Sequence, residues 1–101
     1  MSEIAGFQKK YLKGLAHGKK PVVFIGQKHL TDQVYQEIDK ALNHYELIKV
    51  KCIEFKEKSQ KKEIAGAIVE KANCYLIGMI GHVLIFYRQH PDKEKRKITL
   101  P

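Results

Sequence analysis

The spacing of apolar residues changes partway through residues 30–52, and this change constrains the fold more than any other feature of the sequence. Up to position 45 these residues recur every three or four positions, which is the period of one face of a helix. From Leu47 to Cys52 the period is two, as in a strand with one buried face. A helix therefore leads almost directly into a strand. The helical stripe consists of Leu30, Val34, Ile38, Ala41, Leu42 and Tyr45.

Both of these elements carry further signals. Thr31 is a good N-cap and Asp32 belongs to a first helical turn, so we expect the helix to run from Thr31 to about His44. The buried face of the strand consists of Ile48, Val50 and Cys52. The opposite face carries Lys49 and Lys51 and is open to a partner.

The N-terminal segment predicts another helix and a short strand. Four apolar residues at helical spacing indicate a helix over residues 3–17, with three lysines off that stripe, and a turn at Gly18 and Pro21 ends it. Residues 22–25 form an apolar run without alternation, typical of a strand covered on both faces or nearly so, and Gly26 ends it. The stripe is Ile4, Phe7, Tyr11 and Leu15, and the lysines are Lys9, Lys10 and Lys13.

The second half of the chain predicts a third helix and a hairpin. Residues 54–62 form a charged linker in which Ser59 caps the helix, and the helix ends near Asn73. Its apolar stripe is Ile64, Ala65, Ile68, Val69 and Ala72. Residues 74–80 and 82–88 are rich in strand-forming residues and flank Gly81, which is typical of a β-hairpin.

The resulting order is α-β-α-β-α-β-β in one domain that spans residues 1–101. A chain of this length can bury a core without a metal or disulfide bonds. Three amphipathic helices and four strands predict a two-layer α+β or α/β sandwich with the helices on one side of the sheet. The other face of the sheet would then offer a flat surface.

Basic residues are concentrated in particular segments. Nineteen Lys and Arg against eleven Asp and Glu give a net charge of +8. Residues 1–29 carry six lysines and one acid and residues 49–62 carry six lysines and two acids, whereas residues 30–48 carry one lysine and four acids. A single lysine-rich run is ordinarily solvated surface, but an excess shared by several segments favours a polyanion, with nucleic acid as the natural ligand.

The sequence predicts a non-catalytic protein of a reducing, cytoplasmic compartment. Cys52 and Cys74 lie in apolar segments without CxxC spacing, as buried thiols do. The most apolar stretch, residues 74–87, is shorter than a membrane helix, and the N-terminus does not resemble a signal peptide. Histidine and cysteine spacing matches no metal site or catalytic pair, so we expect no metal, no cofactor and no membrane.

The stretch PVVFIGQKHLTDQVY places a glycine loop between a strand and a helix. The N-terminus of a helix presents unpaired N–H groups, and a preceding glycine lets a phosphate approach closely. Gly26 and Thr31 bound such a loop, and Lys28 adds a positive charge. Junctions of this kind are common, so the stretch alone is also consistent with an ordinary turn.

Several segments together resemble one known family. They are LKGLAHGKKPVVFIG (residues 12–26), HYELIKVK (44–51), IGHVLIFYR (80–88) and KITLP (97–101), with shorter matches at 30–31, 37–38 and 41–42. The combination resembles the YhbY-type CRM domain, the chloroplast RNA splicing and ribosome maturation module. The resemblance covers nearly the whole chain, as expected of the single-domain bacterial members.

This resemblance implies both a fold and a function. The fold is α-β-α-β-α-β-β with a four-stranded mixed sheet, similar to the C-terminal domain of translation initiation factor three. The function is binding of structured RNA, ribosomal RNA in particular, and association with precursors of the large (50S) ribosomal subunit. We expect the protein to be a monomer. The family's GxxG loop, which clamps RNA backbone, matches Gly26, Gln27 and Lys28, but His29 replaces the second glycine.

The histidine leaves two alternatives for this loop. Histidine is among the residues enriched at positive φ, so the loop can keep its path with some strain. Alternatively, the loop opens differently and RNA contacts shift to Lys28 and the neighbouring basic surface. We predict that the backbone cradle is retained and that His29 adds a contact.

The predicted RNA-binding surface joins this loop to basic residues of the first helix, its turn and two strands. Its residues are Gly26, Gln27, Lys28, His29, Thr31, Lys9, Lys10, Lys13, Lys19, Lys20, Lys49, Lys51 and Arg88. Tyr75 and Tyr87 are expected in the core rather than stacked on bases. The alternative function is a protein-interaction module that docks an acidic ribosomal or translation partner on the same basic surface.

Overall fold

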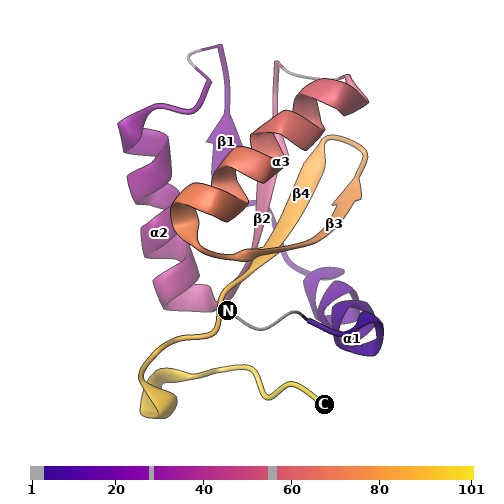
Figure 1. Cartoon of the computed structure of the whole chain (residues 1–101), viewed down its shortest axis with the longest axis vertical. Helices are drawn as coiled ribbons and strands as arrows, with labels where there is room; N and C mark the ends of the chain where they lie inside the picture. The colour runs from indigo at the N-terminus through magenta and orange to yellow at the C-terminus, as the bar shows by residue number, and fades with distance from the viewer. Residues whose placement is uncertain (1–3, 28, 55–56) are drawn as a thin grey trace.

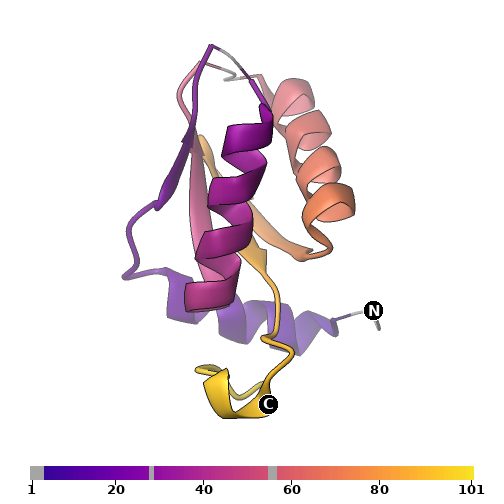
Figure 2. The same ribbon diagram turned by 90° about the vertical axis from the view of Figure 1, so that its left-hand side faces the viewer.

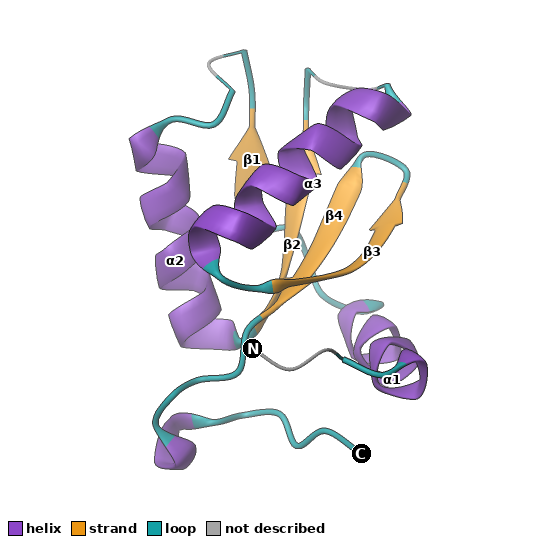
Figure 3. Cartoon of the chain, viewed as in Figure 1, coloured by secondary structure: helices purple, strands orange, loops and turns teal. Residues whose placement is uncertain are grey.

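The helices and strands follow the predicted order along the chain (Figure 3). The computed structural model describes residues 4–27, 29–54 and 57–101. Its elements are α1 (Gly6–Ala16), β1 (Val23–Ile25), α2 (Asp32–Tyr45), β2 (Leu47–Cys52), α3 (Lys58–Ala72), β3 (Tyr75–Ile80) and β4 (Val83–Tyr87). A short 3-10 helix at Lys93–Lys95 follows them.

The strands form one mixed four-stranded sheet in the order β1-β2-β4-β3. β1 runs parallel to β2, whereas β4 pairs antiparallel with both β2 and β3. Gly81 turns the β3–β4 hairpin with a φ of 58°, which a residue without Cβ adopts at no steric cost. The predicted α+β class and the predicted hairpin are therefore confirmed.

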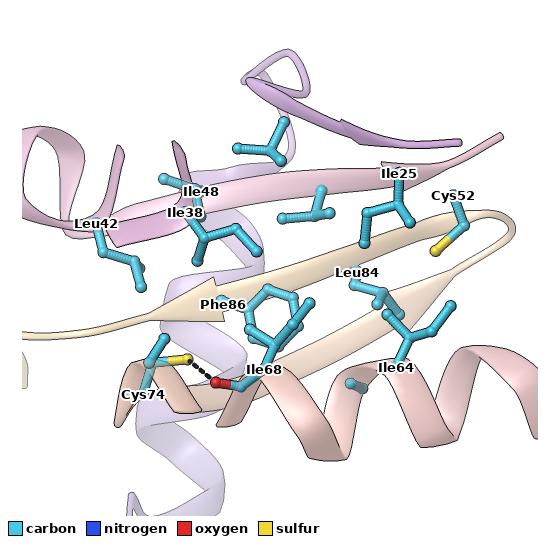
Figure 4. Close-up of a cluster of buried hydrophobic side chains, with 14 residues drawn as sticks. Ile25, Ile38, Leu42, Ile48, Cys52, Ile64, Ile68, Cys74, Leu84 and Phe86 are labelled. Carbon is cyan, nitrogen blue, oxygen red and sulfur yellow. Dashed lines mark hydrogen bonds between the residues drawn. The ribbon is translucent and has the colours of Figure 1, made fainter. Parts of the chain in front are cut away.

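The two helices α2 and α3 cover one face of the sheet and enclose the larger core (Figure 1, Figure 4). The strands supply Val23, Ile25, Ile48, Val50, Cys52, Leu84 and Phe86, and the helices supply Ile38, Leu42, Ile64, Ala65, Ile68 and Ala72. Cys74 joins this core, and its Sγ lies 3.8 Å from the carbonyl oxygen of Ile68. The predicted stripes of both helices thus meet the predicted buried face of β2, except that Tyr45 of the α2 stripe is 42% exposed.

The remaining helix, α1, packs on the opposite face of the sheet, at the end where β2 begins and β4 ends. Leu12 and Ala16 are fully buried there. They form a second cluster with Leu47, Ile77, Ile85 and Tyr87. Figure 2 shows α1 crossing the lower end of the molecule. The prediction that the helices all lie on one side of the sheet is therefore wrong, and only part of the second face stays open.

The predicted buried stripe of α1 is wrong for three residues. Phe7, Tyr11 and Leu15 are 64%, 42% and 38% exposed. The helix contains two series of apolar residues that are offset from each other by one position, and it packs through Leu12 and Ala16. The small Ala16 lets the helix backbone approach the sheet closely, and apolar spacing alone does not show which series will be buried.

The edge strand β1 is buried on one face only, not on both as predicted. Val23 and Ile25 are 2% and 0% exposed, whereas Phe24 is 52% exposed. β1 lies at the edge of the sheet, while α1 packs on β2, β3 and β4. Residues 22–25 hide this alternation because their outward side chains are also apolar.

The helix α3 begins earlier than predicted. It starts at Lys58, so part of the predicted charged linker is helical, and Ser59 lies inside the helix instead of capping it. Lys61 is 7% exposed and donates a hydrogen bond of 2.5 Å to the carbonyl oxygen of Gly81. This lysine joins the first turns of α3 to the hairpin, so a charged segment becomes part of a packed helix.

The buried carboxylate of Glu46 holds the C-terminal segment against the domain. Glu46 follows α2, has a φ of 64° and is 0% exposed. Its Oε1 accepts hydrogen bonds from the backbone N–H groups of Lys97 (2.6 Å) and Ile98 (3.0 Å), and its Oε2 accepts one from His90 (2.7 Å). Charge-assisted hydrogen bonds of this kind offset the removal of a carboxylate from water. Ile98 and Leu100 then pack against the α1 cluster.

Replacing this carboxylate by an amide should destabilise the protein. Glu46→Gln turns one acceptor oxygen into a donor that faces a backbone N–H, so we expect a loss of at least about 2 kcal/mol in the free energy of unfolding. Urea denaturation followed by circular dichroism measures the loss. Glu37→Gln, at an exposed position of α2, is the matched control and should stay within about 0.5 kcal/mol of the parent. Equal stability of the two variants would contradict the role of Glu46.

Candidate nucleic-acid interface

Beyond α1, the second face of the sheet is open. Pairing places Phe24 beside Lys51, Lys51 beside Val83 and Val83 beside Ile80, so these four residues form one row across all four strands. Phe24 and Ile80 are 52% and 63% exposed, and Lys51 is also exposed. Lys49 lies two residues back along β2 and is half-buried. As predicted, both lysines lie on the face of β2 that points away from the larger core.

The apolar members of this row, Phe24, Val83 and Ile80, are not predicted from the sequence. The strands that carry these residues, β1, β3 and β4, are apolar on both faces. No alternation in the sequence therefore shows which side chains face away from the core. The register with the lysines of β2 is the signal that identifies them, and it is visible only once the strands are paired.

Lysines of α1 and of the following turn extend this face. The aliphatic part of Lys13 lies over Gly78 of β3, because a Cβ added to that glycine would be 2.8 Å from Lys13 Cε. Lys19 and Lys20 line a shallow hollow that Lys49 also lines. The structure thus brings together four of the predicted lysines from three separate segments.

Two further predicted lysines, Lys9 and Lys10, are exposed on α1. Residues three and four apart lie on the same side of a helix, so both continue the side that Lys13 occupies. They extend the basic surface along α1, beyond the sheet itself.

The Gly26 loop connects β1 to α2. The N–H of His29 donates to the carbonyl oxygen of Gly26 at 3.0 Å, which closes a tight turn, and Gln27 is exposed. Thr31 caps α2 as predicted, since its Oγ1 accepts a hydrogen bond of 3.2 Å from the N–H of the third helical residue. Lys28 lies outside the described residues.

The backbone of this loop differs in strain at its two ends. Gly26 has no positive φ, and a Cβ added there would meet no atom within 4 Å, so the fold itself does not require glycine. His29 has a φ of 62°, in the left-handed region that glycine adopts without strain and other residues adopt rarely. The expected positive φ at His29 is confirmed.

The structure places Arg88 away from the other predicted site residues. It follows β4, at the end of the sheet away from the Gly26 loop. Its Nη1 donates to Asp39 Oδ1 and to the carbonyl oxygen of Ala72, both at 2.8 Å. Its Nη2 donates to the carbonyl oxygen of Asp39 (3.1 Å) and to Asn43 Oδ1 (3.0 Å). The side chain is 16% exposed and ties α2 to the end of α3, so Arg88 has a structural role and lies apart from the lysines of the open face.

Acidic side chains are concentrated on the other side of the sheet. Asp32, Glu37 and Asp39 are exposed on α2, which covers the face opposite the lysines of β2. An anion that approaches the open face therefore meets mainly lysines, as the uneven charge along the sequence predicts.

The buried thiols and the buried Tyr87 lack the ionised form needed for nucleophilic chemistry. Cys52 and Cys74 are free and buried. Burial raises the pKa of both thiols, and that of Cys74 to about 12, so they are protonated at neutral pH. Burial likewise raises the pKa of Tyr87 to about 12, and this side chain lies in the core as predicted.

The described part of the chain forms neither a metal-ligating cluster nor a helix able to span a membrane. Within residues 4–27, 29–54 and 57–101, no group of three His, Cys, Asp or Glu side chains is placed to hold a metal ion. None of the helices in this part of the chain combines the length and apolarity needed to cross a membrane.

Comparison with known proteins identifies the family. The profile of the CRS1/YhbY (CRM) domain matches residues 4–88. A Haemophilus influenzae protein named "RNA-binding protein" is 44% identical over 101 residues, which cover all of this chain and 98% of that relative. "Probable RNA-binding protein YqeI" of Bacillus subtilis is 32% identical over 98 residues, or 97% of this chain and 99% of that relative. The chain belongs to the CRS1/YhbY (CRM) domain family, as the sequence resemblance predicts.

A solved structure supports the same conclusion for the fold. The solution structure of a hypothetical protein of Staphylococcus aureus matches with a TM-score of 0.81 at 31% sequence identity. The match covers 98% of this chain and 100% of that chain. The two proteins therefore share the arrangement of helices and sheet over nearly their whole length.

The strain at His29 makes a testable difference between two substitutions. Both His29→Gly and His29→Ala remove the imidazole, but only glycine adopts the left-handed conformation freely. We expect the glycine variant to be the more stable by about 1 kcal/mol, as measured by urea denaturation. An alanine variant as stable as the glycine variant would contradict a strained backbone at this position.

Proposed function

We propose that this protein is a non-catalytic RNA-binding protein that acts in the cytoplasm as a monomer. In this proposal it binds ribosomal RNA and assists assembly of the large (50S) ribosomal subunit. The observation that carries the proposal is that lysines of α1, of the following turn and of β2 lie around one open face of the sheet. The names of its relatives, which describe RNA-binding proteins, support RNA as the ligand.

The RNA is held mainly through its phosphates. Lys49 and Lys51 contact the backbone across the sheet, and the α1 lysines extend these contacts. The Gly26 loop begins two residues after Phe24, at the edge of the same face, and the backbone N–H groups at the start of α2 receive a further phosphate beside it. Lys28 and His29 add contacts in the loop. Contacts of this kind recognise the shape and backbone of RNA more than its sequence.

The ribosomal part of the proposal follows from the resemblance to the single-domain bacterial members. The chain matches two relatives over 98% and 99% of their length. Within the present proposal, one small domain binds a ribosomal RNA element during assembly and leaves catalysis to other factors.

A protein-interaction module is the alternative, because an acidic ribosomal or translation partner would also be attracted to these lysines. Nuclease treatment separates the two possibilities. RNA binding predicts that co-sedimentation with large-subunit precursors is lost when exposed RNA is digested. Co-sedimentation that persists, together with no affinity for purified RNA, would favour the protein partner.

Neutralising the lysines of β2 should weaken RNA binding and reduce its salt dependence. We expect Lys49→Gln and Lys51→Gln each to lower affinity for a ribosomal RNA fragment severalfold and to reduce the slope of log affinity against log salt by about 0.7–0.9. Fluorescence anisotropy at several salt concentrations measures both effects. Lys40→Gln, at an exposed position of α2, is the matched control. An equal loss of affinity in the control would exclude the open face as the main interface.

Adding one methyl group to the loop tests close approach of the RNA backbone. Gly26→Ala should leave stability within about 0.5 kcal/mol, because the new Cβ meets no protein atom within 4 Å. It should lower RNA affinity on the order of tenfold, because the Cβ occupies space that a phosphate needs beside the backbone. Gly66→Ala on α3, also free of contacts within 4 Å, is the control and should bind normally. Unchanged affinity of Gly26→Ala would place the RNA elsewhere.

The proposed contact of His29 has its own readout. His29→Gly should bind RNA more weakly than the parent, although its backbone is less strained. An unchanged or tighter dissociation constant would exclude a favourable histidine contact while leaving the rest of the surface in place.

A further inference from the structure

A hollow of about 280 Å³ lies on the open face, between α1 and the sheet. We refer to it as the open-face pocket. Its apolar lining is Pro21, Ile80, Val83 and Ile85, and its basic lining is Lys13, His17 and Lys49. Among these described lining residues there is no carboxylate, and the imidazole of His17 is the one aromatic ring.

The apolar part of the pocket is exposed to water in the isolated protein. Ile80 is 63% exposed at the end of β3, and Val83 beside it is only partly buried. A ligand that covers these side chains gains the free energy of removing apolar surface from water. The pocket therefore favours a ligand with an apolar face.

The basic part of the pocket is positioned by packing. The stem of Lys13 lies over Gly78 of β3, where there is no Cβ to displace it. Lys49 is half-buried on β2, the strand next to β4. Both lysines are thus held at the rim, and a ligand with an anionic group is favoured over a purely apolar one.

We propose that the open-face pocket receives a single unpaired nucleotide of the bound RNA. Its base packs on Ile80 and Val83, and its phosphate lies against Lys13 and Lys49. A nucleotide joins a flat, largely apolar base to a phosphate, which is the pairing of chemistries that the lining presents. This inference rests on the proposed RNA-binding function and specifies which RNA the surface selects.

The selected RNA contains a bulge or a loop and not only an uninterrupted duplex. Bases inside a duplex are stacked and paired, so their faces are not available to a pocket, whereas a bulged base can be turned outward. The volume is slightly below the range of about 300–1,000 Å³ typical of small-molecule sites, which suits one nucleotide. Because the proposed base packs on the aliphatic side chains of Ile80 and Val83 and not on the imidazole of His17, it leaves its stack without stacking on an aromatic ring.

Two RNA hairpins that differ by one nucleotide test the proposal on the full-length protein. They share one stem, and only one of them carries a single-nucleotide bulge, occupied by the fluorescent base 2-aminopurine. We expect the bulged hairpin to bind on the order of tenfold more tightly, because the base removes the exposed apolar surface of Ile80 and Val83 from water. We also expect 2-aminopurine fluorescence to rise on binding, because the base loses its stacked neighbours.

A variant and a matched control locate the effect. Ile80→Ser removes the exposed floor of the pocket and should reduce the preference for the bulged hairpin to about twofold or less, by loss of apolar burial. Leu15→Ser replaces an exposed aliphatic residue of α1 that does not line the pocket, and should keep the full preference.

The outcomes separate this inference from the function on which it rests. Equal affinity for the two hairpins, or quenching of 2-aminopurine on binding, would overturn the pocket while RNA binding stands. No binding of either hairpin at low salt would overturn both. An acidic peptide that binds more tightly than both hairpins would assign the surface to a protein partner and would also overturn the proposal.

Discussion

The packing of α1 on one end of the sheet determines the surface that the protein presents. Leu12 and Ala16 bury completely against Leu47, Ile85 and their neighbours, and the small Ala16 keeps the helix close to the strands. Because α1 covers only this end, the strands beyond it remain open, and Lys13 extends over β3. A longer buried ridge on α1 would cover the same strands and leave no flat basic face.

The strand β2 links the core to that surface. Its alternation sends Ile48 and Val50 into the core under α2 and α3, and it sends Lys49 and Lys51 to the open face. One strand therefore contributes to stability with one set of side chains and, in the proposed function, to RNA binding with the other. Because these lysines extend from a central strand of a packed sheet, their backbone positions are fixed before the proposed RNA contact, so less conformational entropy would be lost on binding.

Local signals in the sequence predict much of this structure. The N-cap at Thr31, the stripes of α2 and α3, the faces of β2 and the hairpin depend on spacing within a few residues, and the structure confirms them except for Tyr45 in the stripe of α2. The features that sequence does not predict depend on contacts between distant segments. The burial of Ala16, the open side of Phe24 and the bonds of Arg88 to α2 and α3 require the strand order, which no single segment encodes.

In the proposed function, RNA binds the open face and the Gly26 loop. Titration of ¹⁵N-labelled protein with a large-subunit ribosomal RNA fragment, followed by amide chemical shifts, tests this binding surface residue by residue. Shifts should concentrate at Lys13, Gly26, Lys49 and Lys51 and diminish as salt is raised. Shifts confined to the exposed side of α2, around Lys40, with the open face unchanged, would contradict it.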